Sequence, residues 1–308
     1  MIKPSSLGDI IHGLQVVAII KRHLPDVTID WVVRDCWEDV IRASKLVNKI
    51  FLFYRHGGIR KFFKLIHNIR RQKYDAVLDM QGLARTGVLT YLSRAARKIG
   101  RWDAREFSRL AYNEIIERPQ GKHAIDILLQ FLPKLGIPAN FEACLTFQLP
   151  SSSIAKLSKC ISPRYVLLFP ESRRVEKQWP YFVQFAEKFA SKYEAMQFII
   201  VGQTAIDVQF KSANILNLTG RTSMMDVLRL IQNCSLLVAN DSAPIHIGAA
   251  MGKPIIAFFG PTDPSKFGPY PVSASDHVIV KCDNLPGLIV DEAWDVVSSK
   301  IDKFLHDD

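Results

Sequence analysis

The chain has 308 residues, 48% of them apolar, which suits one large globular domain or, as the better expectation, two medium domains with real cores. No apolar run approaches the roughly 20 residues that span a bilayer, and the N-terminus lacks the segments of a signal peptide, so a cytoplasmic protein is expected. Five widely spaced cysteines without a Cys-x-x-Cys pair indicate neither a disulfide framework nor a zinc site.

The formal net charge of +10 is unevenly distributed along the chain. Residues 1–155 hold 24 Lys and Arg against 14 Asp and Glu, whereas residues 156–308 hold 16 of each kind. This asymmetry indicates two halves with different partners, the first facing something acidic and the second binding by local geometry. A basic surface that only keeps the protein soluble is the alternative.

Short β-rich runs alternate with amphipathic helical patterns in the first half of the chain. After the end of a first strand at residues 1–3, strands are predicted at 28–33, 49–54, 76–80 and 97–100, and helices at 9–24, 37–44, 59–72, 84–96 and 123–135. This βαβ order predicts a parallel sheet with helices on both faces.

Residues 136–163, with three prolines and a run of three serines, are expected to form a hinge. The alternation then resumes, with strands predicted at 165–169, 197–201, 235–239 and 254–258 and helices at 181–193, 224–232, 243–251 and 291–305. The sequence thus predicts an α/β protein with two Rossmann-like domains, 1–155 and 156–290, which face each other across a cleft that could hold two substrates. The closing segment 291–308 is a helix that could pack back toward the N-terminal domain.

The opening fragment KPSSLGDIIH places Asp9 in the first turn of a helix that directly follows a strand. The helix macrodipole favours an ionised carboxylate there. Asp9 could simply satisfy the helix N-terminus, which is a common role for aspartate. However, the carboxyl edge of a strand beside a cleft is also where a general base reaches a substrate hydroxyl.

Two further motifs follow strands in the second half. FPESRRVEKQWP, residues 169–180, brings hydroxyl and cationic groups between a strand end and a helix start, which suits a diphosphate, although it could be a solvated basic loop. NDSAPIHIGAAMGKP, residues 240–254, lets backbone amides at Ser242 and Ala243 approach a phosphate or ribose, while Asp241 accepts hydrogen bonds from hydroxyls. His246 lies one helical turn further on and could face the same ligand or be structural.

Two turn-rich segments complete the set of motifs. FFGPTDPSKFGPYP, residues 258–271, is dense in Gly and Pro and is expected to shape the wall of the cleft. In LTGRTS, residues 218–223, Thr222 would lie near the 240–254 motif if the strands that precede the two motifs are neighbours.

These blocks together resemble the glycosyltransferase family that contains the ADP-heptose:lipopolysaccharide heptosyltransferases. The resemblance runs from Lys3 to about Tyr270 and includes KPSSLGD, DMQGLARTG at residues 79–87, E-K-x-W-P, N-D-S-x-P-x-H and F-G-P-T-D-P. It implies a GT-B fold, an N-terminal domain for the acceptor, a C-terminal domain for the nucleotide sugar, and inverting transfer of a heptose from ADP-heptose to the lipopolysaccharide inner core. No cofactor and no metal are expected, and the chain has no Asp-x-Asp metal motif.

The resemblance also implies roles for single residues. Asp9 is similar to the general base of that family, and Ser172, Arg173 and Lys177 match positions that hold the donor diphosphate. The rest of the nucleotide-sugar pocket is matched by Thr222, Asp241, Ser242, Ala243 and His246. Two departures leave the donor sugar open, because Ala243 stands where many members have glycine, and the pair at 172–173 replaces a Thr-Thr pair found in the heptosyltransferase I type.

Residues 55–73 carry seven Lys and Arg and no acidic residue. Helical spacing predicts that Phe62, Phe63, Ile66 and Ile69 pack on the sheet. Basic side chains then remain available to the phosphates and carboxylates of an inner-core acceptor (Kdo-lipid A or a heptosyl acceptor) or to an anionic inner-membrane face. The acceptor-binding candidates are Arg60, Lys61, Lys64, Arg101 and Arg105. A solvated helix is the alternative.

Other functions stay open at this point. A sugar-nucleotide epimerase, or a transferase that uses another nucleotide sugar, could have the same donor pocket. A polyanion- or nucleic-acid-binding protein has only the basic first half in its favour, since the sequence contains no recognised nucleic-acid motif, and no nucleic-acid partner is expected. A dinucleotide oxidoreductase is disfavoured because no G-x-G-x-x-G follows a predicted strand.

Overall fold

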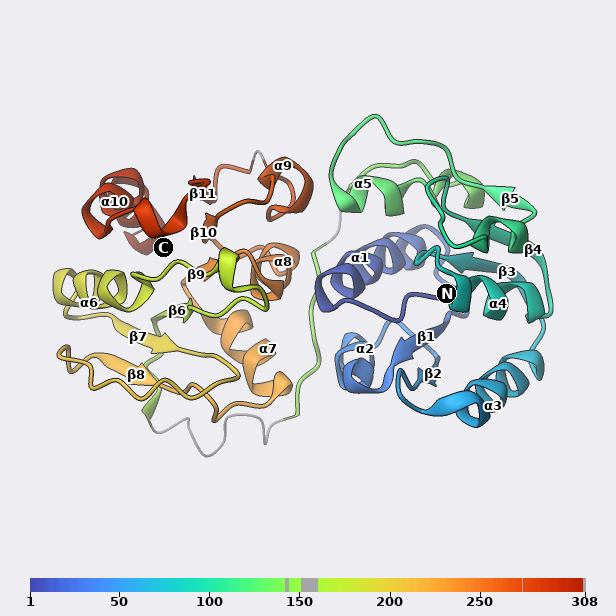
Figure 1. Ribbon diagram of the computed structural model, residues 1–308, viewed down its shortest axis with the longest axis horizontal. Coiled ribbons are helices and arrows are strands. Elements are labelled where there is room, and N and C mark those ends of the chain that lie inside the picture. The colour runs from blue at the N-terminus through green and yellow to red at the C-terminus, as the bar shows by residue number, and fades with distance from the viewer. Residues whose placement is uncertain (142–143, 151–159, 273, 307–308) are drawn as a thin grey trace. The chain divides into compact units, whose positions relative to one another are not determined.

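The computed structural model describes all residues except 142–143, 151–159, 273 and 307–308. The chain forms two compact units, Met1–Gln148 and Leu149–Asp308, and the division between them falls inside the segment expected as a hinge. Each unit is an α/β structure with its own sheet, which can be followed by the colour gradient of Figure 1.

The first unit contains the strands that the sequence predicts, together with a further short strand. Its helices are α1 (Leu7–His23), α2 (Glu38–Ser44), α3 (Gly58–Arg70), α4 (Ala84–Leu92) and α5 (Ala124–Leu129), and its strands are β1 (Asp30–Arg34), β2 (Lys49–Phe53), β3 (Tyr74–Asp79), β4 (Ala95–Gly100) and β5 (Glu114–Ile115). Three 3-10 turns, η1 (Asp35–Trp37), η2 (Ser108–Ala111) and η3 (Pro133–Leu135), complete it.

Two helices of this unit are shorter than predicted. The helix expected at 84–96 ends at Leu92, because Ser93 has an extended backbone and the chain enters β4 at Ala95. The helix expected at 123–135 ends at Leu129, and Pro133 begins the separate 3-10 turn η3. In both cases the apolar pattern continues into the next element, so the pattern alone does not mark the helix end.

The first residues of the chain lie in the middle of the sheet of the first unit. Ile2 forms parallel bridges to Val32 of β1 and to Asp79 of β3, and its backbone N–H donates to the carbonyl of Leu78 at 2.9 Å. The strand order is therefore β2, β1, residues 1–3, β3, β4 and β5, all parallel. In chain order this is 3-2-1-4-5-6, the order of a dinucleotide-binding Rossmann sheet.

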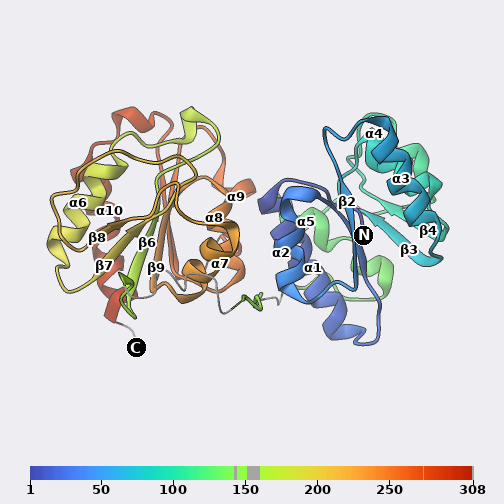
Figure 2. The same cartoon turned by 90° about the horizontal axis from the view of Figure 1, so that it is seen from below.

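Helices cover both faces of this sheet, as predicted. Helices α1, α2 and α5 lie on one face, and α3 and α4 lie on the other (Figure 2). Twelve of the seventeen residues of α1 are buried, so this helix is surrounded by the unit rather than lying on its surface. On the other face, Leu65, Ile66 and Ile69 of α3 pack with Leu89 of α4 against the sheet.

The second unit repeats the same winding. Its strands are β6 (Tyr165–Phe169), β7 (Gln197–Ile200), β8 (Ile215–Asn217), β9 (Leu236–Asn240), β10 (Ile255–Phe259) and β11 (His277–Lys281), and its helices are α6 (Phe182–Lys192), α7 (Met224–Asn233), α8 (Ala243–Ala250), α9 (Pro264–Phe267) and α10 (Val290–His306), with 3-10 turns η5 (Val175–Lys177) and η6 (Leu285–Gly287). The parallel order β11-β10-β9-β6-β7-β8 is again 3-2-1-4-5-6.

The sequence did not predict β5, β8 and β11, which lie at the outer edges of their sheets. The central strands of the second unit, β6, β9 and β10, are buried at every position and therefore carry continuous apolar runs. By contrast, β5 has two residues and β8 has three, and neither contains a buried residue. Short, half-buried edge strands produce too weak a pattern to predict.

An aromatic cluster forms the core of the second unit. Trp179 stacks on Phe258 with ring centroids 4.4 Å apart and contacts Phe185 at 5.4 Å. Helix α10 closes this core with Trp294 and other apolar side chains, and α6 and α10 share one face of the sheet (Figure 2). Each such side chain stabilises the unit by roughly 1.5–3 kcal/mol on burial. A contact of α10 with the first unit stays a prediction.

Candidate active site

The two units have the same topological switch point. In an open sheet of this order, ligands bind outside the carboxyl ends of the first and fourth strands, where the winding reverses. In the first unit these ends lead into the turn at Pro4–Gly8 and into the segment after Asp79. In the second unit they lead into residues 170–178 and into Asp241. The motifs selected from the sequence therefore follow the strands at which such a fold binds ligands.

Asp9 lies at the third position of α1 and closes its N-terminus. Its Oδ2 accepts hydrogen bonds from the backbone N–H of Ser6 at 2.9 Å and from the Ser6 hydroxyl at 2.8 Å. Ser6 and Asp9 occupy the N-cap and third helical positions of a capping box, and Asp9 satisfies the backbone N–H of the N-cap residue, so it does perform the structural role that the sequence left open. Its other oxygen, Oδ1, lies 3.4 Å from Nζ of Lys3. The Lys3 side chain is only 2% exposed, whereas that of Asp9 is 39% exposed.

The electrostatic surroundings keep Asp9 ionised. Burial acts to raise the pKa of Asp9, but the ammonium of Lys3 and the two hydrogen bonds from Ser6 outweigh it and lower this pKa to about 2. Burial lowers the pKa of Lys3, while the charge of Asp9 opposes that change. A buried cation thus holds a partly exposed carboxylate at the switch point of the first unit.

Asp79, at the end of β3, shapes the neighbouring turn. It is fully buried, its Oδ1 accepts the backbone N–H groups of Gln81 and Gly82 at 3.0 Å each, and its Oδ2 accepts the Tyr112 hydroxyl at 2.8 Å. Burial raises the pKa of Asp79 against the effect of these hydrogen bonds. Gly82 has φ +72°, a conformation that favours glycine. The D-x-Q-G segment is therefore a fixed turn, a role that the sequence analysis did not assign.

The structure places Arg101 at the same edge of the sheet as this turn. Its guanidinium binds the carboxylate of Asp103 through two hydrogen bonds, at 2.8 and 2.7 Å, and donates to the carbonyl of Met80 at 3.3 Å. The charge of Arg101 also contributes to the lowered pKa of Lys3. Arg105 donates its backbone N–H to Gly82, and its side chain is exposed.

The basic helix α3 is packed differently from the prediction. Ile66 and Ile69 are buried and Phe62 is half-buried, as expected, but Phe63 is 60% exposed and Leu65 occupies the packed position instead. The helical face is rotated relative to the prediction because four apolar residues in sequence, at 62, 63, 65 and 66, fit two neighbouring stripes. Exposed basic side chains on this helix include Arg60, Lys61 and Lys64.

Asp241 is the centre of a hydrogen-bonded cluster in the second unit. Its side chain is only 6% exposed. The carboxylate accepts a hydrogen bond from Nζ of Lys177 at 2.7 Å and another from the hydroxyl of Thr262. Its backbone carbonyl accepts the Ser172 hydroxyl at 2.9 Å. The structure thus brings Ser172, Lys177 and Asp241 together. Thr262, in the Gly- and Pro-rich motif after β10, belongs to the same cluster and was missed, although its position directly after a strand is a detectable signal.

Asn240 is a second residue that the sequence analysis missed. It is fully buried at the end of β9, its Oδ1 accepts the backbone N–H of Trp179 at 3.3 Å, and its Nδ2 donates to the carbonyl of Pro170 at 2.6 Å. It therefore holds the two ends of the segment after β6 against β9. Gln178 adds a hydrogen bond from its Nε2 to the carbonyl of Ser172 at 2.6 Å. This connected loop positions Lys177.

The remaining candidates surround this cluster less closely. Ser242 precedes α8 and donates its hydroxyl to the carbonyl of Asn240 at 3.2 Å, while Ala243 and His246 lie in the first two turns of α8 and are half-buried. Arg173 is exposed. The strand before Thr222 is not a neighbour of the strand before the 240–254 motif, because β6 and β7 lie between β8 and β9, so the condition set for their proximity is not met. Thr222 instead precedes α7, which packs against α8.

Within the described residues, no cluster of three or more His, Cys, Asp and Glu side chains could hold a metal ion. None of the helices in the described part of the chain has the length and apolar character needed to cross a membrane.

Comparison with known proteins identifies the class of this two-unit α/β protein. The family model "Glycosyltransferase family 9 (heptosyltransferase)" matches residues 62–286, which is more than half of the chain. The chain therefore belongs to glycosyltransferase family 9, and it is a glycosyltransferase.

Its relatives agree with this assignment. The lipopolysaccharide core heptosyltransferase OpsX of Haemophilus influenzae is 26% identical over 286 residues, which cover 88% of this chain and 81% of OpsX. Among solved structures, the E. coli heptosyltransferase WaaC with ADP has a TM-score of 0.79 at 21% identity and covers 98% of both chains. The family 9 glycosyltransferase of Veillonella parvula has a TM-score of 0.81 at 19% identity, covering 97% of this chain and 95% of that one. The predicted GT-B fold is thereby confirmed.

Proposed function

We propose that this glycosyltransferase transfers a heptose from ADP-heptose to an acidic lipopolysaccharide inner-core acceptor, by inversion and without a metal ion, at the cytoplasmic face of the inner membrane. Membership of the family and the names of its relatives support the donor and the acceptor class. The observation that carries the mechanism is the half-exposed, ionised carboxylate of Asp9 at the switch point of the first unit. The first unit would then be the acceptor domain and the second unit the nucleotide-sugar domain.

In this mechanism Asp9 is the general base. The acceptor hydroxyl attacks the anomeric carbon while the bond from that carbon to the ADP oxygen breaks, and Oδ1 of Asp9 takes the hydroxyl proton. A single displacement inverts the anomeric configuration. A carboxylate with a pKa of about 2 is a weak base, but it is always in the form that accepts a proton. It suffices if the proton moves late, after bonding to the sugar has made the hydroxyl acidic.

The donor side of the mechanism depends on Lys177. Its ammonium and the exposed guanidinium of Arg173 neutralise the charge that develops on the departing diphosphate. Ser172 and the start of α8 at Ser242 and Ala243 supply hydroxyl and backbone donors to the phosphates. Asp241 holds Lys177 in place, and Thr222 and His246 contact the rest of the nucleotide sugar.

The acceptor is held by positive charge on the first unit. Arg101 is fixed by Asp103 and by the Met80 carbonyl at the edge that carries Asp9, so it can bind an acceptor phosphate or carboxylate with little loss of side-chain entropy. Arg60, Lys61, Lys64 and Arg105 would add longer-range attraction for an acidic glycolipid.

The direct test is transfer by the purified protein. Incubation with ADP-heptose and Kdo-lipid A, or with a heptosyl acceptor, should increase the acceptor mass by one heptose and release ADP only when both substrates are present. The product should have the anomeric configuration opposite to that of the donor, and chelators should not change the rate. Epimerised nucleotide sugar without acceptor product would refute the proposal in favour of an epimerase.

The nucleotide specificity has its own test. Thermal unfolding in the presence of ADP, UDP, GDP and ADP-heptose should show the largest rise of Tm with ADP and ADP-heptose, because ligand binding to the folded form alone raises its stability. A larger rise with UDP or GDP would indicate another nucleotide sugar as donor.

A further inference from the structure

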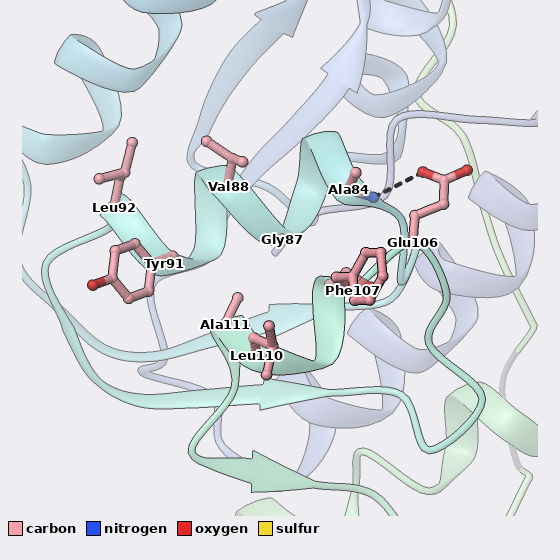
Figure 3. A pocket seen from close by; sticks show the side chains of 10 residues that line it. Ala84, Gly87, Val88, Tyr91, Leu92, Glu106, Phe107, Leu110 and Ala111 are labelled. Carbon is pink, nitrogen blue, oxygen red and sulfur yellow. Dashed lines mark hydrogen bonds between the residues drawn. The ribbon is translucent and has the colours of Figure 1, made fainter.

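A mostly apolar groove of about 350 Å³ lies on the first unit between α4 and the 3-10 turn η2 (Figure 3). Four large apolar side chains beside it are turned to solvent rather than into the core: Phe107 is 88% exposed, Leu110 82%, Tyr91 65% and Val88 43%. Single exposed apolar residues are normal, but a contiguous group that lines a groove marks an interaction surface.

The local backbone holds this groove open. Glu106 and Phe107 have φ values of +55° and +60°, which are uncommon for residues other than glycine. Glu106 accepts the backbone N–H of Ala84 at the start of α4 at 3.0 Å, as Figure 3 shows. A Cβ at Gly87 would lie 2.8 Å from Cβ of Ser108, so the close approach of α4 and η2 requires glycine there. The exposed position of Phe107 is thus built into a constrained turn.

Basic side chains flank the groove. Arg85 at the start of α4 and Arg109 within η2 are exposed and form no ion pair in the part of the chain that the structure describes. Lys98 donates to the carbonyl of Tyr91 at 2.6 Å, and its ammonium lies 5.4 Å from the centre of the Tyr91 ring. The carboxylate of Glu106 is already bound to the N-terminus of α4. Arg85, Lys98 and Arg109 outnumber this one carboxylate, so the net charge around the groove is positive.

The neighbouring helix α3 continues this character. Its exposed side includes Ile59 (70% exposed) and Phe63 (60%), which are one helical turn apart among basic residues. Arg70 of α3 donates to the carbonyl of Leu92 of α4 at 2.9 Å, so the two helices are tied together on one face of the sheet (Figure 2). Apolar side chains surrounded by Lys and Arg are typical of surfaces that lie in a lipid headgroup region.

We propose that this docking surface, formed by Val88, Tyr91, Phe107, Leu110, Arg85 and Arg109, binds an anionic phospholipid bilayer. The aromatic and aliphatic side chains enter the boundary between headgroups and acyl chains, and the guanidinium groups contact lipid phosphates. A second copy of the chain is a poorer occupant, because it would bring two positive surfaces together. The inference rests on the proposed function in one respect, namely that a lipid-linked acceptor is met at a membrane.

The test is vesicle binding by the full chain. Co-sedimentation should be strong with vesicles that mix phosphatidylglycerol and phosphatidylcholine and weak with phosphatidylcholine alone. Phe107→Asn with Leu110→Gln should reduce binding to the mixed vesicles at least tenfold, since stable association needs both inserted apolar side chains and attraction to anionic lipid. Arg85→Gln with Arg109→Gln should abolish the preference for phosphatidylglycerol. Val296→Gln, which replaces an exposed apolar residue of α10, should bind as the unmodified protein does.

Two activity measurements separate this inference from the proposed function. All of these variants should keep the same Tm, the same ADP-induced rise of Tm, and the same transfer rate to a deacylated acceptor. Failure of the unmodified protein to bind mixed vesicles would overturn the docking proposal even if it transfers heptose. Vesicle binding without any transfer would instead refute the proposed function alone. If the groove variants keep vesicle binding but raise KM for a detergent-dispersed acylated acceptor, the groove holds acceptor acyl chains and bilayer docking is wrong.

Discussion

Both units place a lysine beside an aspartate at their switch point, but they assemble this pair in different ways. Lys3 and Asp9 belong to one strand–turn–helix connection, whereas Lys177 and Asp241 come from the loops after β6 and β9, 64 residues apart. The N–O distances are 3.4 Å in the first pair and 2.7 Å in the second. The aspartate is 39% exposed in the first pair and 6% in the second.

This difference fits the two roles proposed above, a carboxylate that takes up a proton and one that positions a cation. Asp9 is bound by Ser6 on one oxygen and keeps a loose contact with Lys3 on the other, so an incoming hydroxyl can approach it. One oxygen of Asp241 binds both Lys177 and Thr262, and the side chain is almost covered. The same two residue types therefore suit proton transfer in the first unit and positioning of a cation in the second.

The largest expected effect is on turnover, and it concerns the first pair. Asp9→Asn should reduce kcat by on the order of 10²–10⁴-fold, the usual contribution of a positioned base. The asparagine oxygen can still accept hydrogen bonds from Ser6, so the affinity for ADP should change little. The buried ammonium of Lys3 loses its counter-charge, so the Tm should fall. Steady-state kinetics and ADP titration measure these quantities. Asp26→Asn, at an exposed position after α1, is the matched control, and an Asp9→Asn enzyme with normal turnover would remove the general base from the mechanism.

The second pair should respond chiefly in stability. Asp241→Asn leaves the ammonium of Lys177 without its counter-charge, and the unfolding free energy should fall by about 3 kcal/mol, near the low end for a broken buried pair. Guanidinium unfolding followed by Trp fluorescence measures this. Adding Lys177→Met should restore part of the loss, because the unpaired charge is then gone. Asp263→Asn is the control, since it is exposed and asparagine also caps a helix well. If Asp241→Asn and Asp263→Asn lower the free energy of unfolding equally, the buried Lys177–Asp241 pair does not stabilise the protein more than an exposed helix cap does.

The two pairs also show how far the sequence alone reaches. The Lys3–Asp9 pair is local, so a strand end, a turn and a helix start within ten residues suffice to predict a carboxylate at a strand edge. The buried central strands were likewise predictable, because their apolar runs need no partner to be recognised. The sequence also indicates that 169–180 and 240–254 follow strands.

What the sequence could not show depends on contacts between distant segments. That Thr262 and Asn240 join the Lys177 cluster follows from strand order. Whether the strand before Thr222 neighbours the strand before the 240–254 motif also depends on strand order, which the sequence left open and which places two other strands between them. Phe63 was placed on the packed face of α3 because its spacing fits a second stripe nearly as well as Leu65 fits the first. Edge strands such as β8 carry too few apolar residues to be detected.

A pH profile can sharpen the comparison further, because it tests whether Lys3 sets the ionisation of Asp9. The native pKa of Asp9 is about 2, below its ordinary value of 3.8, so the carboxylate stabilises the fold above pH 3.8, and this contribution is lost as the pH falls through about 2. An opposite charge lowers a carboxyl pKa by about 1–3. Lys3→Met removes that charge but leaves the burial, so the pKa of Asp9 should rise to its ordinary value or above.

Because activity requires the ionised carboxylate of Asp9, kcat/KM falls as the pH is lowered through the pKa of Asp9. In Lys3→Met this fall (the acid limb of the pH profile) should occur at higher pH. The acid limb of the unmodified protein should lie below the range in which it stays folded. Lys73→Met, an exposed position in the same unit, should leave the profile unchanged. Superimposable profiles for Lys3→Met and the unmodified protein would mean that the hydrogen bonds from Ser6 keep Asp9 ionised without Lys3.

The smallest effect concerns the surroundings of the two pairs, because the whole positive excess of the chain lies in its first half. Neutralising Arg60, Lys61 and Lys64 together with glutamine should raise KM for an acidic acceptor several-fold and weaken its dependence on salt, while kcat and KM for the donor stay the same. These side chains are exposed, so no loss of stability is expected. The matched variant in the second unit neutralises three exposed residues, Lys211, Arg221 and Lys300, and should leave acceptor kinetics unchanged. If both triple variants raise KM for the acceptor equally, acceptor binding depends on the net charge of the whole chain and not on the basic residues of α3. The positive charge of the first half would then have no specific role in acceptor binding, even if the two Lys–Asp pairs differ as described.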